Sequence, residues 1–130
     1  MSNDAVDRAR SLIGTRFRAQ GRDPNFGLDC IGLAMIAYGI GEDQVRCDYR
    51  LSGDHRCELT AGLAGGFRRV ARSSTRAGDL MLLEVALRRV HLAVRTATGF
   101  VHADVRRGVV ETPGEPEWPV VATFRKRRNG

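Results

Sequence analysis

The segment from residue 29 to residue 38 constrains the fold more than any other part of the sequence, because it is apolar almost all round. A helix without a polar face has to be buried in a hydrophobic core. The chain has 130 residues, which is enough for one such core and too few for two. We therefore predict a single domain, residues 1–130, built around a buried helix that Gly39 and Gly41 end.

Beyond residue 77 the hydrophobic period changes from that of a helix to that of strands. Five segments are expected as strands, at residues 80–85, 89–95, 99–103, 109–111 and 120–125. The short spacing between them favours antiparallel pairing. Helices first and strands afterwards predict an α+β domain, with the buried helix packed on one face of an antiparallel sheet.

The remaining segments are expected to flank or connect these elements. Residues 4–13 predict an amphipathic helix, with Asn3 or Asp4 as N-cap and Gly14 just past its end. Residues 14–28 predict a long loop, of a kind that often lines a site in a small domain. Residues 42–75 are expected to be connecting structure with one short helix at residues 57–63.

The formal net charge of +6 is concentrated at the C-terminal end. Residues 125–128 supply four positive charges, and the rest of the chain carries +2. A basic run without interleaved aromatic residues predicts a solvated tail, at about residues 125–130, rather than a nucleic-acid interface. Steering toward an anionic partner stays open.

The cysteine content and the lack of long apolar segments limit the compartments and the cofactors that we expect for this chain. We find no secretory leader and no membrane span, so we expect a protein made in the cytoplasm. Three cysteines are an odd number for such a chain, so a disulfide framework is not expected. Cys47, His55 and Cys57 lack the paired spacing of a zinc site, and we expect no metal and no organic cofactor.

Cys30 follows Asp29 at the start of the buried helix. Asp29 is a good N-cap residue, which places Cys30 in the first turn. The positive end of the helix favours thiolate over thiol, and its N–H groups can stabilise an oxyanion. The alternative is a small buried hydrophobic residue. Gly27 and Gly32 favour the nucleophile, because they are expected to leave room for a substrate backbone.

A thiolate needs a base, and the chain has three histidines, His55, His91 and His102. His91 is expected in the middle of one strand and His102 on the next, joined by a hairpin turn. A core histidine held by hydrogen bonds is the alternative for His91.

Turn register decides whether these two side chains meet. A turn centred between Ala97 and Thr98 places His91 opposite Asp104, on the same face as His102. A turn centred one residue earlier places His91 directly opposite His102, whereas a half-step shift separates them. Two of three registers therefore give a base with a polar partner, as in cysteine hydrolases.

Five short motifs, taken in order, resemble the NlpC family of cell-wall cysteine peptidases, which share a papain-like core. They are IGTRF at residues 13–17, LDCIGL at 28–33, AGDL at 77–80, VHLAV at 90–94 and FVHA at 100–103. The resemblance implies Cys30 as nucleophile, His91 as base and His102 as the residue that orients it. It also implies the stem peptides of peptidoglycan as substrate.

The short form without a secretion signal resembles the phage-tail and gene-transfer-agent branch of this family. That branch implies tail proteins as partners and a virion or tail as the working location.

Several positions depart from the family pattern. Phe17 stands where a tyrosine usually lies near the oxyanion site, and residues 19–21 replace a Trp-Gly-Gly stretch. Gln20 is the candidate replacement donor, and Asp29 and Asp104 complete the candidate substrate-binding set. Losing one oxyanion donor costs on the order of 100-fold or more, so weak activity is expected. Two alternatives stay open: an inactive tail-assembly protein of the same fold, and an amidase or acyltransferase using the same Cys30–His91 pair.

Overall fold

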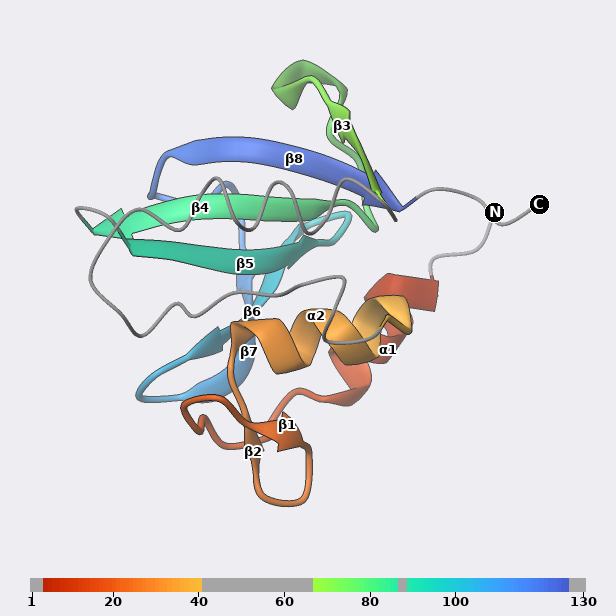
Figure 1. Ribbon diagram of the computed structural model, residues 1–130. Coiled ribbons are helices and arrows are strands. Elements are labelled where there is room, and N and C mark those ends of the chain that lie inside the picture. The colour runs from red at the N-terminus through yellow and green to blue at the C-terminus, as the bar shows by residue number, and fades with distance from the viewer. Residues whose placement is uncertain (1–3, 41–66, 87–88, 127–130) are drawn as a thin grey trace.

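The computed structural model describes residues 4–40, 67–86 and 89–126 (Figure 1). Its helices are α1 (Asp4–Ser11), α2 (Cys30–Tyr38) and the short 3-10 helix η2 (Arg72–Ser74). Its strands are β1 (Arg22–Asp23), β2 (Gly27–Leu28), β3 (Phe67–Val70), β4 (Leu80–Ala86), β5 (Arg89–Arg95), β6 (Gly99–Asp104), β7 (Gly108–Pro113) and β8 (Val120–Lys126). Neither α-helix in these ranges is long and apolar enough to cross a membrane.

Local sequence explains both ends of α2. The Asp29 side chain caps the first turn, accepting a hydrogen bond from the Gly32 backbone N–H at 2.7 Å. At the other end Gly39 takes a left-handed conformation with φ 64°, and its N–H donates to the Met35 carbonyl. Seven of the nine residues of α2 are buried, which confirms the prediction of an interior helix.

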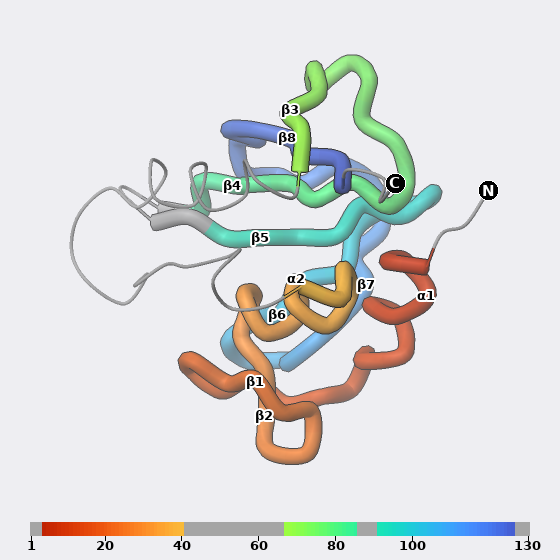
Figure 2. The backbone as a smooth tube through the Cα atoms, turned by 45° about the vertical axis from the view of Figure 1, so that its right-hand side comes forward, coloured from red at the N-terminus to blue at the C-terminus, as the bar shows by residue number. Residues whose placement is uncertain are grey.

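The main sheet has six antiparallel strands in the order β3-β8-β4-β5-β6-β7. Helix α2 packs against β5 and β6, with α1 beside it. Figures 1 and 2 show β6 and β7 turning away from the direction of β4 and β5. The β1–β2 hairpin lies on the side of α2 that faces away from β4 and β5. The predicted α+β architecture is confirmed.

The two faces of the sheet bury different clusters. The larger cluster joins α2 to residues such as Leu82 and Leu92, and it includes Cys30. The smaller cluster is formed by Met81, Leu83, Ala93 and Phe100, with Trp118 packed against it. Because side chains alternate along a strand, residues next to each other in β4 and β5 belong to different clusters.

All five predicted strands are present, each longer than or equal to its predicted span. Strands β1, β2 and β3 lie in segments that we predicted as loop or connecting structure, so that prediction is wrong there. The helix predicted at residues 57–63 lies outside the described residues.

The C-terminal basic run also begins differently from the prediction. Arg125, which the predicted strand and the predicted tail shared, is part of β8, and so is Lys126, which we predicted in the tail. Arg125 forms a salt bridge to buried Asp79, and Lys126 Nζ donates to the Tyr38 carbonyl at 2.6 Å. Buried acceptors hold both cations in the sheet.

Candidate active site

The carboxylate of Asp29 links the start of α2 to the hairpin that precedes it. Its Oδ1 accepts from the Gly32 N–H and from Arg22 Nη1, the latter at 2.8 Å, and its Oδ2 accepts from the Gln20 N–H at 2.9 Å. Asp29 is only 1% exposed. The sequence predicted the cap, but the structure adds Arg22 as the counter-ion of a carboxylate that directly precedes Cys30.

Cys30 is the first residue of α2, is buried and carries a reduced thiol. Its place at the positive end of the helix dipole lowers the cost of forming a thiolate. The expectation that Gly27 and Gly32 leave room for substrate is wrong. A Cβ at Gly32 would lie 2.2 Å from the Gly21 carbonyl oxygen, and one at Gly27 would lie 2.7 Å from Arg18 Cβ. These glycines allow the chain to pack against itself.

The structure brings His91 and His102 together. His91 Nε2 lies 3.2 Å from His102 Nδ1, and the two rings meet edge to face. The paired residues of β5 and β6, Val94 with Val101 and Arg95 with Phe100, show the register of a turn centred between Ala97 and Thr98. That register is one of the two that we predicted would place both imidazoles on one face.

Asp104, which this register places opposite His91, has a different set of contacts. Its Oδ2 accepts from the backbone N–H groups of Arg106 at 3.0 Å and Arg107 at 2.8 Å, closing the turn between β6 and β7. It therefore acts on the imidazoles through its charge, while His102 makes the hydrogen-bonding contact with His91.

Thr112 of β7 continues this chain of contacts. Its Oγ1 lies 3.1 Å from His102 Nε2, so both ring nitrogens of His102 have a polar neighbour. The predicted strand at residues 109–111 stopped one residue short of Thr112. Period-2 alternation continued by one residue would have included it, although a neighbour of His102 cannot be read from sequence spacing.

Aromatic rings surround the imidazole pair. The Trp118 ring centroid lies 6.4 Å from that of His91 and 5.9 Å from that of His102, and Phe100 lies 5.0 Å from His102. His102 is 2% exposed, whereas His91 is partly exposed. The sequence analysis did not single out Trp118, which lies between the predicted strands at residues 109–111 and 120–125.

This environment lowers the pKa of both histidines. Burial is the main cause for His91, followed by the neighbouring His102, and together they lower its pKa to about 4, although Asp104 and Asp29 act to raise it. Burial also lowers the pKa of His102. Both imidazoles are therefore mainly neutral at pH 7, the form in which a histidine can accept a proton. The effect of Asp29 on His91 places the start of α2 within electrostatic range of this pair.

The other predicted substrate-binding residues lie on the segment before α2. The Phe17 side chain packs against the helix-side cluster, and its backbone forms a bridge with Leu28. Gln20 is exposed, with a left-handed backbone at φ 60° and its N–H donated to Asp29. Phe17 has no hydroxyl to donate, and the Gln20 backbone N–H is committed to Asp29.

Within the described ranges, no group of three or more His, Cys, Asp or Glu residues is arranged to hold a metal ion. Cys47, His55 and Cys57, which we considered for zinc, lie outside those ranges.

Neither a family model nor a curated protein sequence matches the chain, but solved structures do. The NlpC/p60 domain of the peptidoglycan hydrolase SagA matches with a TM-score of 0.60 at 22% identity, over 87% of this chain and 90% of that one. A protein similar to a lipoprotein of the NLP/P60 family, from Staphylococcus aureus, matches with a TM-score of 0.63 at 19% identity. The chain is covered to 98% in that match but spans only 41% of the Staphylococcus aureus chain. The α+β papain-like fold of NlpC/P60 domains is thereby established for this chain.

Proposed function

We propose that this protein is a cysteine peptidase that hydrolyses peptide bonds in the stem peptides of peptidoglycan, with Cys30 as nucleophile and His91 as base. One observation carries the proposal. A neutral imidazole, held at its Nε2 by a second histidine, lies within electrostatic range of the helix terminus that begins with Cys30. The NlpC/P60 fold supports the choice of substrate, because one of the solved structures that share it is the domain of a peptidoglycan hydrolase, SagA.

The contacts of His91 support Nδ1 as the nitrogen that reacts. Its Nε2 faces His102 Nδ1, so Nδ1 is the nitrogen left for the thiol proton. The Cys30 sulfur attacks the peptide carbonyl carbon as its proton passes to His91 Nδ1. His91 then returns this proton to the departing amine, the C–N bond breaks, and water hydrolyses the resulting thioester.

The charges around the site favour this transfer during the reaction. A pKa of about 4 leaves His91 unprotonated at pH 7 and able to accept the thiol proton, and the same low pKa makes the imidazolium costly to form. The helix terminus stabilises the developing thiolate, and the carboxylates of Asp29 and Asp104 stabilise the developing imidazolium. In this scheme Asp29 and Asp104 act by charge without needing to touch substrate.

The oxyanion site is the weaker part of the proposed machinery. The first turn of α2 supplies backbone N–H groups, but the Gly32 N–H is already bonded to Asp29. Phe17 contributes no hydroxyl. We therefore expect turnover below that of a site with a side-chain donor, by on the order of 100-fold.

The closing test compares the purified protein with its Cys30→Ala variant on peptidoglycan fragments, with mass spectrometry of the products. We expect peptide release by the wild type to fall by at least about a thousand-fold in the variant, since removing a catalytic nucleophile costs this much or more. Circular dichroism of both proteins shows whether the fold is retained. Equal release by two folded proteins would rule the proposal out.

A second candidate is a tail-assembly protein that keeps the fold without hydrolysis, and the missing hydroxyl at Phe17 is the observation that favours it. Tail proteins, the partners that the resemblance to the phage-tail branch implies, are proposed under either candidate. A thiol-reactive probe separates the two: a peptidase should label at Cys30 much faster than at Cys47 or Cys57 near neutral pH. Comparable labelling of all three favours the assembly protein.

The same mass spectra test for an amidase or acyltransferase. Transfer of the acyl group to an added amine, in place of water, would assign the Cys30–His91 pair to acyl transfer.

A further inference from the structure

We propose that Thr112 is a positioning residue that accepts the hydrogen of His102 Nε2, and so stabilises the His102 tautomer that leaves His91 Nδ1 free to accept a proton. This inference rests on the proposed function, because it concerns the same base. Three side chains carry it: Thr112 Oγ1 lies 3.1 Å from His102 Nε2, and His102 Nδ1 lies 3.2 Å from His91 Nε2.

Each neutral imidazole has one N–H and one lone pair, so these contacts can be satisfied in two ways. In the first, His91 Nε2–H donates to His102 Nδ1, and His102 Nε2–H donates to the Thr112 hydroxyl oxygen. In the second, every donor is reversed: Thr112 donates to His102 Nε2, and His102 Nδ1–H donates to His91 Nε2. The first leaves His91 Nδ1 with a lone pair, whereas the second puts a hydrogen on it.

Only the first arrangement is compatible with the proton transfer. Once His91 Nδ1 has taken the thiol proton, both nitrogens of His91 carry hydrogen, and Nε2 can no longer accept from His102. His102 must then accept at Nδ1 and carry its own hydrogen at Nε2. Thr112 Oγ1 is the oxygen that the structure places at that hydrogen.

The burial of His102 makes this acceptor matter. His102 is 2% exposed and flanked by Phe100 and Trp118. An N–H in such surroundings is costly to leave without an acceptor. Register places Thr112 correctly: it pairs with Phe100 while His102 pairs with Val110, so Thr112 lies diagonally from His102 on the same face of the sheet.

The substitutions Thr112→Val and Thr112→Ser separate the hydroxyl from the shape of the side chain. Thr112→Val should lower kcat about tenfold with little change in KM, because substrate contacts are untouched, while Thr112→Ser should stay within about twofold of wild type. Thr123→Val is the control. It removes the hydroxyl of another sheet residue, on β8, whose neighbour is the Thr75 hydroxyl, and it should leave kcat unchanged. Equal kcat for Thr112→Val and wild type would overturn the proposal.

A second measurement does not depend on turnover. Nitrogen-15 NMR of the imidazoles at about pH 8, where both are neutral, reports which ring nitrogen carries hydrogen. We expect hydrogen at Nε2 of both His91 and His102 in the wild type and in Thr112→Ser, with His102 shifting toward Nδ1–H in Thr112→Val. Hydrogen at His102 Nδ1 in the wild type would overturn the proposal whether or not the chain cleaves peptide. The expected tautomers in a protein that cleaves nothing would instead refute the proposed function alone.

Discussion

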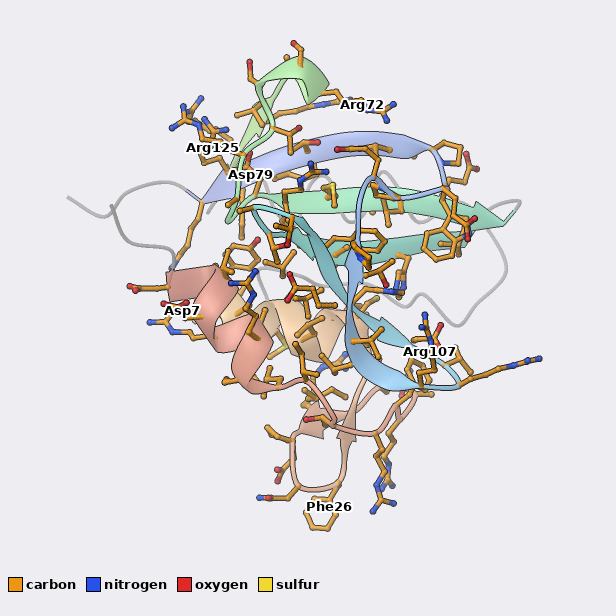
Figure 3. All side chains as sticks on the ribbon, turned by 180° about the vertical axis from the view of Figure 1, so that it is seen from behind. Asp7, Phe26, Arg72, Asp79, Arg107 and Arg125 are labelled. Carbon is orange, nitrogen blue, oxygen red and sulfur yellow. The ribbon has the colours of Figure 1, made fainter. Side chains whose placement is uncertain are left out.

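Two buried aspartates, Asp29 and Asp79, have nearly the same surroundings and are expected to differ in what they do. Each is 1% exposed, and each accepts hydrogen bonds from one arginine and from backbone N–H. Asp79 takes both Nε and Nη2 of Arg125, at 2.9 and 2.8 Å. Figure 3 shows this pair at the opposite end of the molecule from Phe26, which lies between β1 and β2. A buried Asp–Arg pair is thus a stabilising interaction in this fold. Such a pair can affect catalysis only where it lies near the reacting groups.

The electrostatic reach of each carboxylate shows the difference. Asp29 raises the pKa of His91, while Asp79 adds to the effect of burial in raising the pKa of Tyr38, whose hydroxyl donates to the Gly78 carbonyl. One carboxylate acts on a group that is proposed to exchange a proton during the reaction. The other acts on a phenol that stays protonated.

Matched substitutions give the largest expected contrast. Asp29→Asn and Asp79→Asn each remove one charge and place an amide N–H where a carboxylate oxygen accepted a backbone N–H, so each should cost about 2–3 kcal/mol of unfolding free energy. Only Asp29→Asn should lower kcat/KM, by about tenfold at most, since it also withdraws charge from His91. Denaturant unfolding and peptide-release kinetics on both variants check this. Equal losses of activity would show that the two aspartates do not differ.

The pH dependence of the free energy of unfolding should next distinguish the region around His91 from the region around Asp79. The pKa of His91 is about 4 in the folded protein, below its ordinary value of 6.5. As the pH falls, His91 is therefore protonated in the unfolded chain at a higher pH than in the folded protein. The free energy of unfolding is thus unaffected by His91 above pH 6.5 and decreases as the pH drops toward 4. We expect a loss of about 2 kcal/mol, after allowance for the partial exposure of His91.

The control for this titration is a His91→Gln variant, unfolded in denaturant at several pH values. It should lose most of the fall between pH 6.5 and 4, and Asp79→Asn should keep it. A wild-type stability that is flat across this range would contradict the lowered pKa.

A smaller effect is expected from the ring that covers the imidazoles. Trp118→Ala should let water reach His91 and His102, weakening the burial that lowers their pKa values. The acid limb of kcat/KM against pH should then move upward by about one pH unit, while kcat at the optimum changes little. An unmoved limb would mean that Trp118 does not control the hydration of the pair.

The sequence predicted those parts of the fold that depend on local pattern. An apolar run with Asp29 before it and Gly39 after it defines a buried helix, and period-2 alternation defines the longer strands. The sequence left three registers open for the hairpin that turns before Gly99, and the structure has one of the two that bring the histidines to one face. Strands of two residues such as β1 and β2 are too short to show such a period. They form by backbone contacts, with each other and, for β2, with Phe17.

The unpredicted parts of the site come from side chains of separate segments that meet only when the chain folds. Arg22, Thr112 and Trp118 each belong to a different segment from the group that they contact. Gly32 is instructive, because a glycine beside a nucleophile was expected to admit substrate and instead admits the Gly21 carbonyl. A sequence shows that space is needed at such a position, but only the assembled backbone shows what fills it.

Trp118 is the only tryptophan in the chain, and its indole lies beside both imidazoles. A protonated imidazole quenches indole emission more strongly than a neutral one. We therefore expect the intrinsic tryptophan fluorescence of the protein to follow the charge state of this histidine pair, without any label and before any substrate has been identified.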